Sequence, residues 1–303
     1  MLKQHVDRYV ALRRATGFKF KDSEAALLSF ARFAEERGDE VVRAETAVAW
    51  AGQAKTSQRS HDLLRVVTRF AQFLRAEDPR HELPPDRFFR PKAIRPSPHI
   101  FSEEDIARIV AYAAKLGPVG SLRPLTYSTM YGLIAVAGLR RNEAIELRIG
   151  DFTGDGLVIK GTKFNKSRFV PLHETTIAQV ERYLDARRKV AGHTDHLFIS
   201  LRRKQLDPHT VLMTFRDICE KAGLGRTVSG ARPRLHDLRH TFAVRALERC
   251  PAGRDAVNRH MLALTTYMGH ARVESTYWYL ERTPQMLRDI ADACEAFMTG
   301  GDA

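Results

Sequence analysis

The sequence predicts a mainly α-helical protein of two domains that contains one small antiparallel β-sheet. Apolar residues recur at helical spacing through most of the 303 residues, and one pair of short apolar runs flanks a polar turn. Six of the thirteen prolines fall between Pro79 and Pro98. Because proline removes a backbone donor and disfavours helix in the residue before it, we expect a linker over 79–98. The expected domains are an all-α unit, residues 1–95, and a mixed unit, residues 96–303.

The segment before the linker predicts three amphipathic helices and a shorter helix over 46–54. Their apolar positions follow the i, i+3, i+4 spacing of a single buried face. The three faces are Val6, Tyr9, Val10 and Leu12; Ala26, Leu27, Phe30, Phe33 and Ala34; and Leu63, Leu64, Val67, Phe70, Ala71 and Leu74. The polar faces are rich in arginine, with Arg59, Arg65, Arg69 and Arg75 among them.

The segment after the linker predicts several helices and one β-hairpin. Ser102, with Asp105 three positions later, has the pattern of a helix N-cap, so a helix is expected from there to about Lys115. A buried helix over 125–137 should end at Gly138. The hairpin is expected from the runs 157–159 and 168–172, with the polar stretch 161–167 at its tip. Further helices are expected over 176–190, 208–222, 236–248 and in a segment before Met268.

The charge of the chain favours a polyanionic partner. The formal net charge is +13, and residues 1–95 carry 19 Lys and Arg against 13 Asp and Glu, an excess of 6 that leaves 7 for the rest. Two basic domains suit a clamp around a polyanion, because each neutralised phosphate releases counterions. The alternative is a soluble protein that is basic without such a partner. The longest apolar run, 131–139, is too short to cross a bilayer. Three widely spaced cysteines favour reduced thiols, and with no signal-peptide pattern we expect a cytoplasmic protein.

Four short motifs carry the candidate functional residues. Arg140 and Glu143 stand one helical turn apart, close enough to pair. Lys163 lies at the expected hairpin tip, with Lys166 as its competitor. The remaining candidates are His236, Arg239 and His240 on one expected helix face, then His270 after Gly269, and finally Tyr279. Each motif alone has an ordinary structural interpretation, such as a surface ion pair, a solvated lysine or a packed tyrosine.

The histidines His236 and His240 also have the i, i+4 spacing of a metalloprotease helix. An arginine on the same face would repel a divalent cation, and aspartate stands where such sites use glutamate. A phosphate is the better ligand for this helix face, because arginine binds it through a bidentate pair of hydrogen bonds and histidine adds a proton donor. We therefore expect neither a metal nor a cofactor.

The order Arg, Lys, His-x-x-Arg, His, Tyr along one chain resembles that of the tyrosine recombinases, also called the phage integrase family. By this resemblance, Arg140, Arg239 and His270 bind the non-bridging oxygens of a scissile phosphate. Lys163 protonates the leaving 5′-oxygen, and His236 assists proton transfer at the tyrosine. Tyr279, nine residues after His270, becomes the nucleophile of a 3′-phosphotyrosyl link, with Tyr277 expected only to pack. Glu143 and His240 are expected to hold these groups in position without contacting the phosphate.

The resemblance also implies partners. They are a double-stranded DNA recombination site, further copies of this chain from dimer to tetramer, and in some systems a partner recombinase. The tail, residues 284–303, has helical spacing and is expected to pack on its own domain or on a neighbouring protomer. With about 95 residues before the catalytic half, we expect a minimal Xer-like or transposon-type member without an arm-site domain. The span of 31 positions between Arg239 and His270 is longer than is typical.

Three alternatives share parts of this pattern. A type IB topoisomerase-like enzyme uses the same chemistry without strand exchange. A DNA-binding regulator keeps the fold after losing catalysis. A metal-dependent relaxase also uses a tyrosine, but it is sensitive to EDTA, whereas a recombinase of this family tolerates a chelator.

Overall fold

The computed structural model describes residues 2–18, 20–90, 98–160, 167–190, 194–225, 232–250 and 254–269. The chain divides into two compact units, Met1–Arg95 and Pro96–Ala303, and each unit has its own hydrophobic core. Within the described ranges, helices are the main element, and a three-stranded antiparallel sheet accompanies them. The predicted fold class is confirmed. No described helix is both long and apolar enough to cross a membrane.

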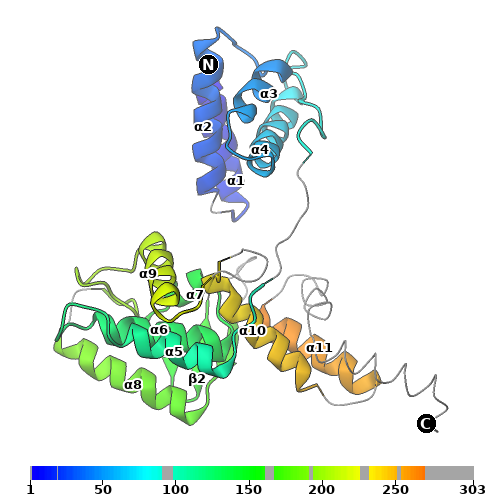
Figure 1. The fold of residues 1–303 in the computed structure, drawn as a ribbon. Coiled ribbons are helices and arrows are strands. Elements are labelled where there is room, and N and C mark those ends of the chain that lie inside the picture. Colours follow the sequence, from blue (N-terminus) through cyan, green and yellow to red (C-terminus); the bar gives the residue numbers. More distant parts are fainter. Residues whose placement is uncertain are drawn as a thin grey trace. The chain divides into compact units, whose positions relative to one another are not determined.

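Four helices form the described part of the first unit (Figure 1). They are α1 (Leu2–Ala15), α2 (Lys21–Glu36), α3 (Ala44–Gly52) and α4 (Ser57–Arg75). Their predicted apolar faces meet in one core, in which Leu27, Phe30, Val67 and Phe70 are fully buried. Leu12 is an exception, because its side chain is 47% exposed. It follows Val10 by two residues, which turns it about 200° around the helix and away from the core.

Helix α4 presents basic side chains to solvent. The Thr56 side chain caps the helix by accepting a hydrogen bond from the backbone N–H of Arg59 at 3.2 Å. Arg59, Arg65, Arg69 and Arg75 are all exposed, as the polar-face prediction requires.

Helices are the main element in the described part of the second unit, and they surround a core that includes Tyr131, Tyr183, Phe198 and Phe215. The helices are α5 (Glu103–Ala113), α6 (Arg123–Ala137), α7 (Arg141–Glu146), the 3₁₀ turn η1 (Ile149–Asp151), α8 (Glu174–Lys189), α9 (Pro208–Lys221), α10 (Leu235–Glu248) and α11 (Arg254–Met268). The expected cap of α5 is present as a full capping box between Ser102 and Asp105.

The sheet contains the predicted hairpin and one additional short strand. Strands β1 (Phe152–Thr153), β2 (Gly156–Ile159) and β3 (Arg168–Pro171) pair antiparallel in the order β1-β2-β3. Ile159 pairs with Arg168, so Arg168 is the first residue of β3 and lies at the loop end of the hairpin. The two residues of β1 are too few for a periodicity to reveal them.

Helix α11 packs on α10 through a second, smaller apolar cluster. Val244 and Leu247 of α10 pack with Met261, Leu264 and Met268 of α11. This packing fixes the C-terminal end of α11 beside α10, and the site described next depends on that placement.

Candidate active site

The first cationic motif is fixed by the end of α6. Gly138 stops this helix in the left-handed conformation, with φ at 59°, as the sequence predicts. Leu139 is then fully buried, and Arg140 becomes the N-cap residue of α7. Because Ala144 and Ile145 anchor α7 in the core, the backbone around Arg140 has little freedom.

Arg140 and Glu143 form the predicted ion pair. Nη1 of Arg140 lies 2.7 Å from Oε1 of Glu143, and the backbone N–H of Arg140 donates to Oε2 at 2.9 Å. The Arg140 side chain is 36% exposed, whereas that of Glu143 is only 10% exposed. The carboxylate therefore holds the arginine from the interior, and part of the guanidinium faces solvent.

A second arginine, Arg168 of β3, binds the same carboxylate. Its Nη1 donates to Oε1 of Glu143 at 2.9 Å, and its Nη2 donates to Oε2 at 2.7 Å. This bidentate pair is largely shielded from solvent, since both side chains are 10% exposed. It joins the hairpin to α7.

The charge state of Glu143 follows from these contacts. Burial by itself raises the pKa of the carboxyl, but the hydrogen bonds and charge of Arg168, followed by the hydrogen bonds of Arg140, outweigh it. They lower the pKa of Glu143 to about 2, so the group is ionised at neutral pH. Two guanidinium groups around one carboxylate leave a net charge of +1.

Arg239 links three helices at the centre of the site. Its side chain is 1% exposed. Nη1 donates to the carbonyl of Gly138 at 2.5 Å, and Nη2 donates to the carbonyl of Met268 at 2.6 Å. Nη2 of Arg140 donates to the next carbonyl, that of Gly269, at 2.8 Å. Two predicted arginines from separate motifs thus converge on adjacent peptide groups at the end of α11.

The two histidines of α10 lie together, as their spacing predicts. The rings of His236 and His240 are 4.5 Å apart between centroids and nearly perpendicular, at 79°. His240 is buried, while His236 keeps much of its surface exposed to solvent. The surrounding protein atoms remove water from the imidazole of His236 and so disfavour its charged form. This desolvation, followed by the positive charge of Arg239, lowers the pKa of His236. Its imidazole is therefore neutral at pH 7 and can accept a proton.

The geometry does not favour the metalloprotease alternative. Asp237, the acid of the His-Asp-x-x-His pattern, is 1% exposed. Its carboxylate caps α10 by accepting from the backbone N–H of Arg234 at 2.8 Å and from Nη2 of the same residue at 2.8 Å. In the described part of the chain, no three His, Cys, Asp or Glu side chains gather as they would around a metal ion.

Three of the predicted catalytic residues, Lys163, His270 and Tyr279, lie outside the described residues, as do Lys166, Tyr277 and the tail 284–303. The structure brings Arg140, Glu143, Arg239, His236 and His240 together. Arg168 is the site residue that sequence reasoning missed, since the sequence places it only in the expected strand 168–172. Its position in the sequence motif Arg168-Phe-Val-Pro-Leu was the available signal, but its partner depends on strand register.

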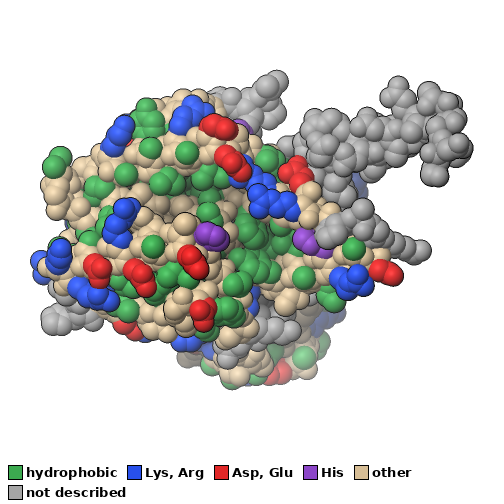
Figure 2. Space-filling view, turned by 90° about the horizontal axis from the view of Figure 1, so that it is seen from below, with side chains coloured by type: hydrophobic (Ala, Val, Ile, Leu, Met, Phe, Trp, Pro, Cys, Tyr) green, Lys and Arg blue, Asp and Glu red, His purple; other side chains and the backbone are tan. Residues whose placement is uncertain are grey.

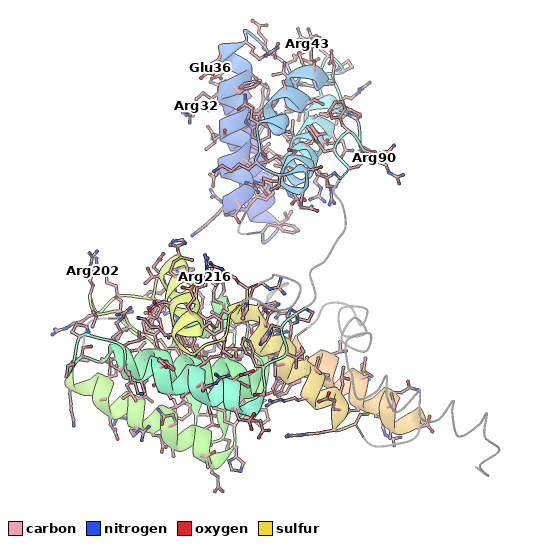
Figure 3. All side chains as sticks on the ribbon, viewed as in Figure 1. Arg32, Glu36, Arg43, Arg90, Arg202 and Arg216 are labelled. Atoms are coloured by element: carbon pink, nitrogen blue, oxygen red, sulfur yellow. The ribbon has the colours of Figure 1, made fainter. Side chains whose placement is uncertain are left out.

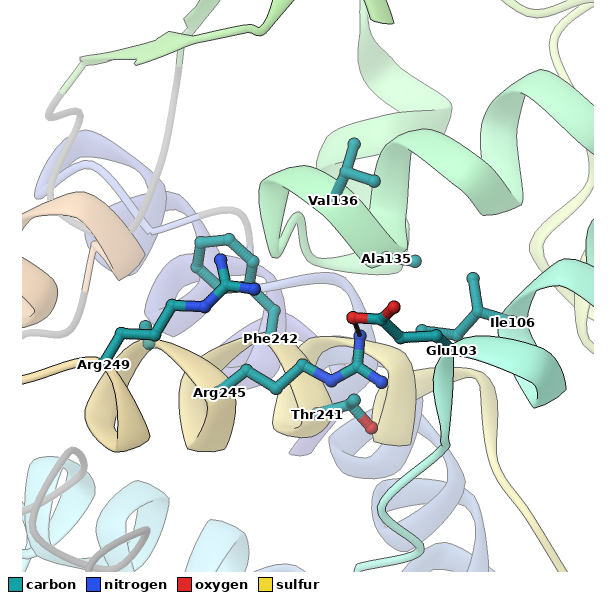
Figure 4. Close-up of a pocket in the computed structure, with 9 residues that line it drawn as sticks. Glu103, Ile106, Ala135, Val136, Thr241, Phe242, Arg245 and Arg249 are labelled. Atoms are coloured by element: carbon teal, nitrogen blue, oxygen red, sulfur yellow. Dashed lines mark ion pairs between the residues drawn. The ribbon is translucent and has the colours of Figure 1, made fainter.

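A hollow lies on the other side of α10 from the two histidines. A cavity of about 340 Å³ lies between α5, α6 and α10 (Figure 4). Its floor includes Ile106 and Phe242, and Arg245 pairs with Glu103 across it at 3.7 Å. Among the described residues, neither Arg140, His236 nor Arg239 lines it.

Comparison with known proteins identifies the family of this chain. Residues 99–286 match the model of the phage integrase family. The chain belongs to this family. A Sinorhizobium fredii protein named as a candidate integrase/recombinase, y4rB, is 37% identical over 300 residues, which are 95% of each chain.

A second family member, the tyrosine recombinase XerA of Pyrococcus horikoshii, is 30% identical over 219 residues, covering 71% of this chain and 67% of XerA. A solved structure, the XerH site-specific recombinase bound to a palindromic difH substrate, has a TM-score of 0.65 at 20% identity. That match covers 89% of this chain and 78% of the XerH chain, and it shows that the phage integrase fold is shared.

Gly138 provides a test of how this site is held. A Cβ at this position would lie 2.5 Å from Cδ1 of Phe242, and the positive φ adds backbone strain. Gly138→Ala is expected to lower the free energy of unfolding by about 3 kcal/mol. Since the Gly138 carbonyl holds Arg239, the rate of DNA cleavage should fall as well. Thermal melts and single-turnover assays check both effects. Gly150→Ala, where a Cβ meets nothing within 4 Å, is the control.

Proposed function

We propose that this phage integrase family member cuts and rejoins DNA at a specific site, with Tyr279 as the nucleophile. The observation that carries the proposal is the convergence of Arg140 and Arg239 on the carbonyls of Gly269 and Met268. The next residue in the sequence is His270, the third proposed phosphate ligand. Three cationic or donor groups from three motifs would then surround one phosphate.

The reaction needs positive charge where negative charge develops. When a phenol oxygen attacks a phosphodiester, the phosphorus becomes five-coordinate and its non-bridging oxygens gain charge. Fixed donors from Arg140, Arg239 and His270 stabilise those oxygens. The ion pair with Glu143 orients the partly exposed guanidinium of Arg140, which can then bind a phosphate. No metal or nucleotide is needed in this scheme.

Proton transfers complete the mechanism. A free phenol has a pKa of about 10, so Tyr279 must lose its proton during attack. The neutral imidazole of His236 is proposed to assist, and Lys163 is proposed to protonate the leaving 5′-oxygen. The product is a 3′-phosphotyrosyl link, which keeps the bond energy until a 5′-hydroxyl from another strand attacks.

The partner is double-stranded DNA, and several exposed arginines are placed to contact its phosphates. In the first unit they include Arg65 and Arg69 on α4. In the second unit, Arg202 and Arg216 extend away from the region of α9 into solvent (Figure 3). On the face that Figure 2 shows, acidic and basic side chains are interspersed, which suits DNA phosphates less well. We propose the first unit as the core-binding domain.

The α4 contacts predict a change in salt dependence. Replacing Arg65 and Arg69 together with alanine should weaken DNA binding and reduce the slope of log K against log salt by about 2. Binding isotherms at several salt concentrations measure this slope. Arg188→Ala removes an exposed arginine that pairs with Asp185 on α8, and it should leave the slope unchanged. An unchanged slope in the double variant would remove α4 from the interface.

The number of DNA strands that are exchanged determines how many protomers must act together. Two duplexes contain four exchanging strands, and each active site cuts one of them. We therefore propose that four protomers act together on paired sites, built from dimers on each site, with a partner recombinase in some systems. We propose that the protein acts in the cytoplasm, where its DNA substrate would lie. A minimal Xer-like or transposon-encoded role fits this chain.

The test begins by sequencing DNA that the wild-type protein captures covalently in its host. A plasmid with two captured sites is then incubated with the protein in EDTA and without ATP. Recombinant products are expected. Relaxed plasmid without recombinants would instead indicate a type IB topoisomerase-like enzyme. The absence of any covalent adduct would indicate a silent regulator. The loss of adducts in EDTA would indicate a metal-dependent relaxase.

A further inference from the structure

Arg168 and Glu143 form an ion pair that is largely shielded from solvent, and Glu143 also pairs with the proposed phosphate ligand Arg140. Glu143 accepts four hydrogen bonds from two residues, two from Arg140 and two from Arg168. The Arg168 side chain is 10% exposed, and its buried Nε has no partner among the residues described. Both of its terminal nitrogens are committed to Glu143. Arg168 is therefore placed to neutralise the carboxylate of Glu143.

The charge count shows what Arg168 contributes. Glu143 is needed to orient Arg140, but its negative charge alone would cancel the positive charge of Arg140. With Arg168 present, the three groups keep a net charge of +1. Without it, the pair of Arg140 and Glu143 is neutral, and an incoming phosphate would meet much less attraction in a site that is partly shielded from water.

The end of α11 fixes the same arrangement from the other side. Gly269 has φ at 63°, and a Cβ there would lie 2.8 Å from Nη1 of Arg168 and 3.5 Å from Nη1 of Arg140. Both guanidinium groups therefore lie against this peptide, whose carbonyl also accepts from Arg140. Because Arg168 begins β3, the hairpin that carries Lys163 in sequence is joined to this point.

We propose that Arg168 is a positioning residue for DNA cleavage, which neutralises Glu143 so that Glu143 can orient Arg140 without cancelling its charge. This inference rests on the proposed function, because it assigns the charge of Arg140 to the scissile phosphate. It requires two properties of Arg168, a positive charge and a forked pair of donors. Lysine supplies only the first of these.

Three variants test the proposal: Arg168→Lys, Arg168→Met and the double variant Arg168→Met with Glu143→Gln. Single-turnover rates of covalent adduct formation are measured on a nicked DNA substrate at saturating protein, together with thermal melts. Arg168→Met should lower the rate by on the order of 100-fold, comparable to losing one donor to the transition state. Arg168→Lys should fall between this variant and the wild type.

The double variant provides the decisive comparison. It restores the net charge of +1 at Arg140 without restoring any packing of Arg168, so it should cleave faster than Arg168→Met. A purely structural role in anchoring β3 predicts no such rescue. A double variant no faster than Arg168→Met, or an Arg168→Met variant that cleaves at the wild-type rate, would overturn the proposal.

The same variants distinguish a loss of folding from a loss of cleavage. If Arg168→Met unfolds, the double variant should still fold and cleave, because it has no carboxylate at position 143 that has lost two of its four hydrogen bonds. An unfolded or inactive double variant then counts against the proposal. Arg188→Met, at an exposed ion pair with Asp185, is the matched control and should keep the wild-type rate. Failure of the proposed function itself looks different, because the wild-type protein would then form no adduct.

Discussion

Replacing Tyr279 with phenylalanine is expected to abolish covalent attachment to DNA while leaving DNA binding nearly unchanged. The substitution removes a single hydroxyl oxygen, which is the proposed attacking atom, and keeps the aromatic ring. The cationic groups that bind phosphate remain in place, so the variant should bind the same site. Adducts trapped on a nicked substrate and separated under denaturing conditions measure attachment, and mobility shifts measure binding.

Tyr277→Phe is the matched control for this experiment. Tyr277 lies two residues before Tyr279 and would face a different side of any helix, so it is expected only to pack. This control should form adducts at close to the wild-type rate. Undiminished adducts from Tyr279→Phe, or their loss in Tyr277→Phe, would reject Tyr279 as the nucleophile.

Replacing Arg239 with alanine is expected to reduce the cleavage rate by on the order of 100-fold or more, by analogy with the loss of one oxyanion donor. The change also removes the donor from two carbonyls, those of Gly138 and Met268, so some stability should be lost. Single-turnover cleavage at saturating DNA, measured well below the melting temperature of the variant, separates the two effects.

Arg245→Ala is the corresponding control on the same helix. Arg245 also bonds a carbonyl, that of Phe101 at 3.0 Å, but it faces the separate cavity between α5, α6 and α10. It should lose stability without a comparable loss of cleavage. Equal rate losses in the two variants would mean that Arg239 acts only through folding.

Local patterns predicted the parts of this site that depend on neighbours in sequence. The spacing of Arg140 and Glu143 predicted their ion pair, and Gly138 predicted the end of α6. The i, i+4 spacing of His236 and His240 placed their rings together. For these two pairs, the spacing along a helix determines which side chains can meet.

Contacts between distant segments could not be predicted in the same way. The bond between Arg168 and Glu143 depends on the register of β3 against β2 and on how the hairpin meets α7. The bonds of Arg239 to Gly138 and Met268 depend on the packing of α11 on α10. Leu12 shows that local spacing can also mislead, because the pattern included it in the buried face of α1 although it is 47% exposed.

The most direct test of the central claim is to map the covalent bond itself. Wild-type protein is trapped on a nicked substrate, digested with protease and nuclease, and its peptides are sequenced by mass spectrometry. The account predicts a nucleotide joined through its 3′-phosphate to the oxygen of Tyr279. A nucleotide on any other side chain, or a link through a 5′-phosphate, would contradict it.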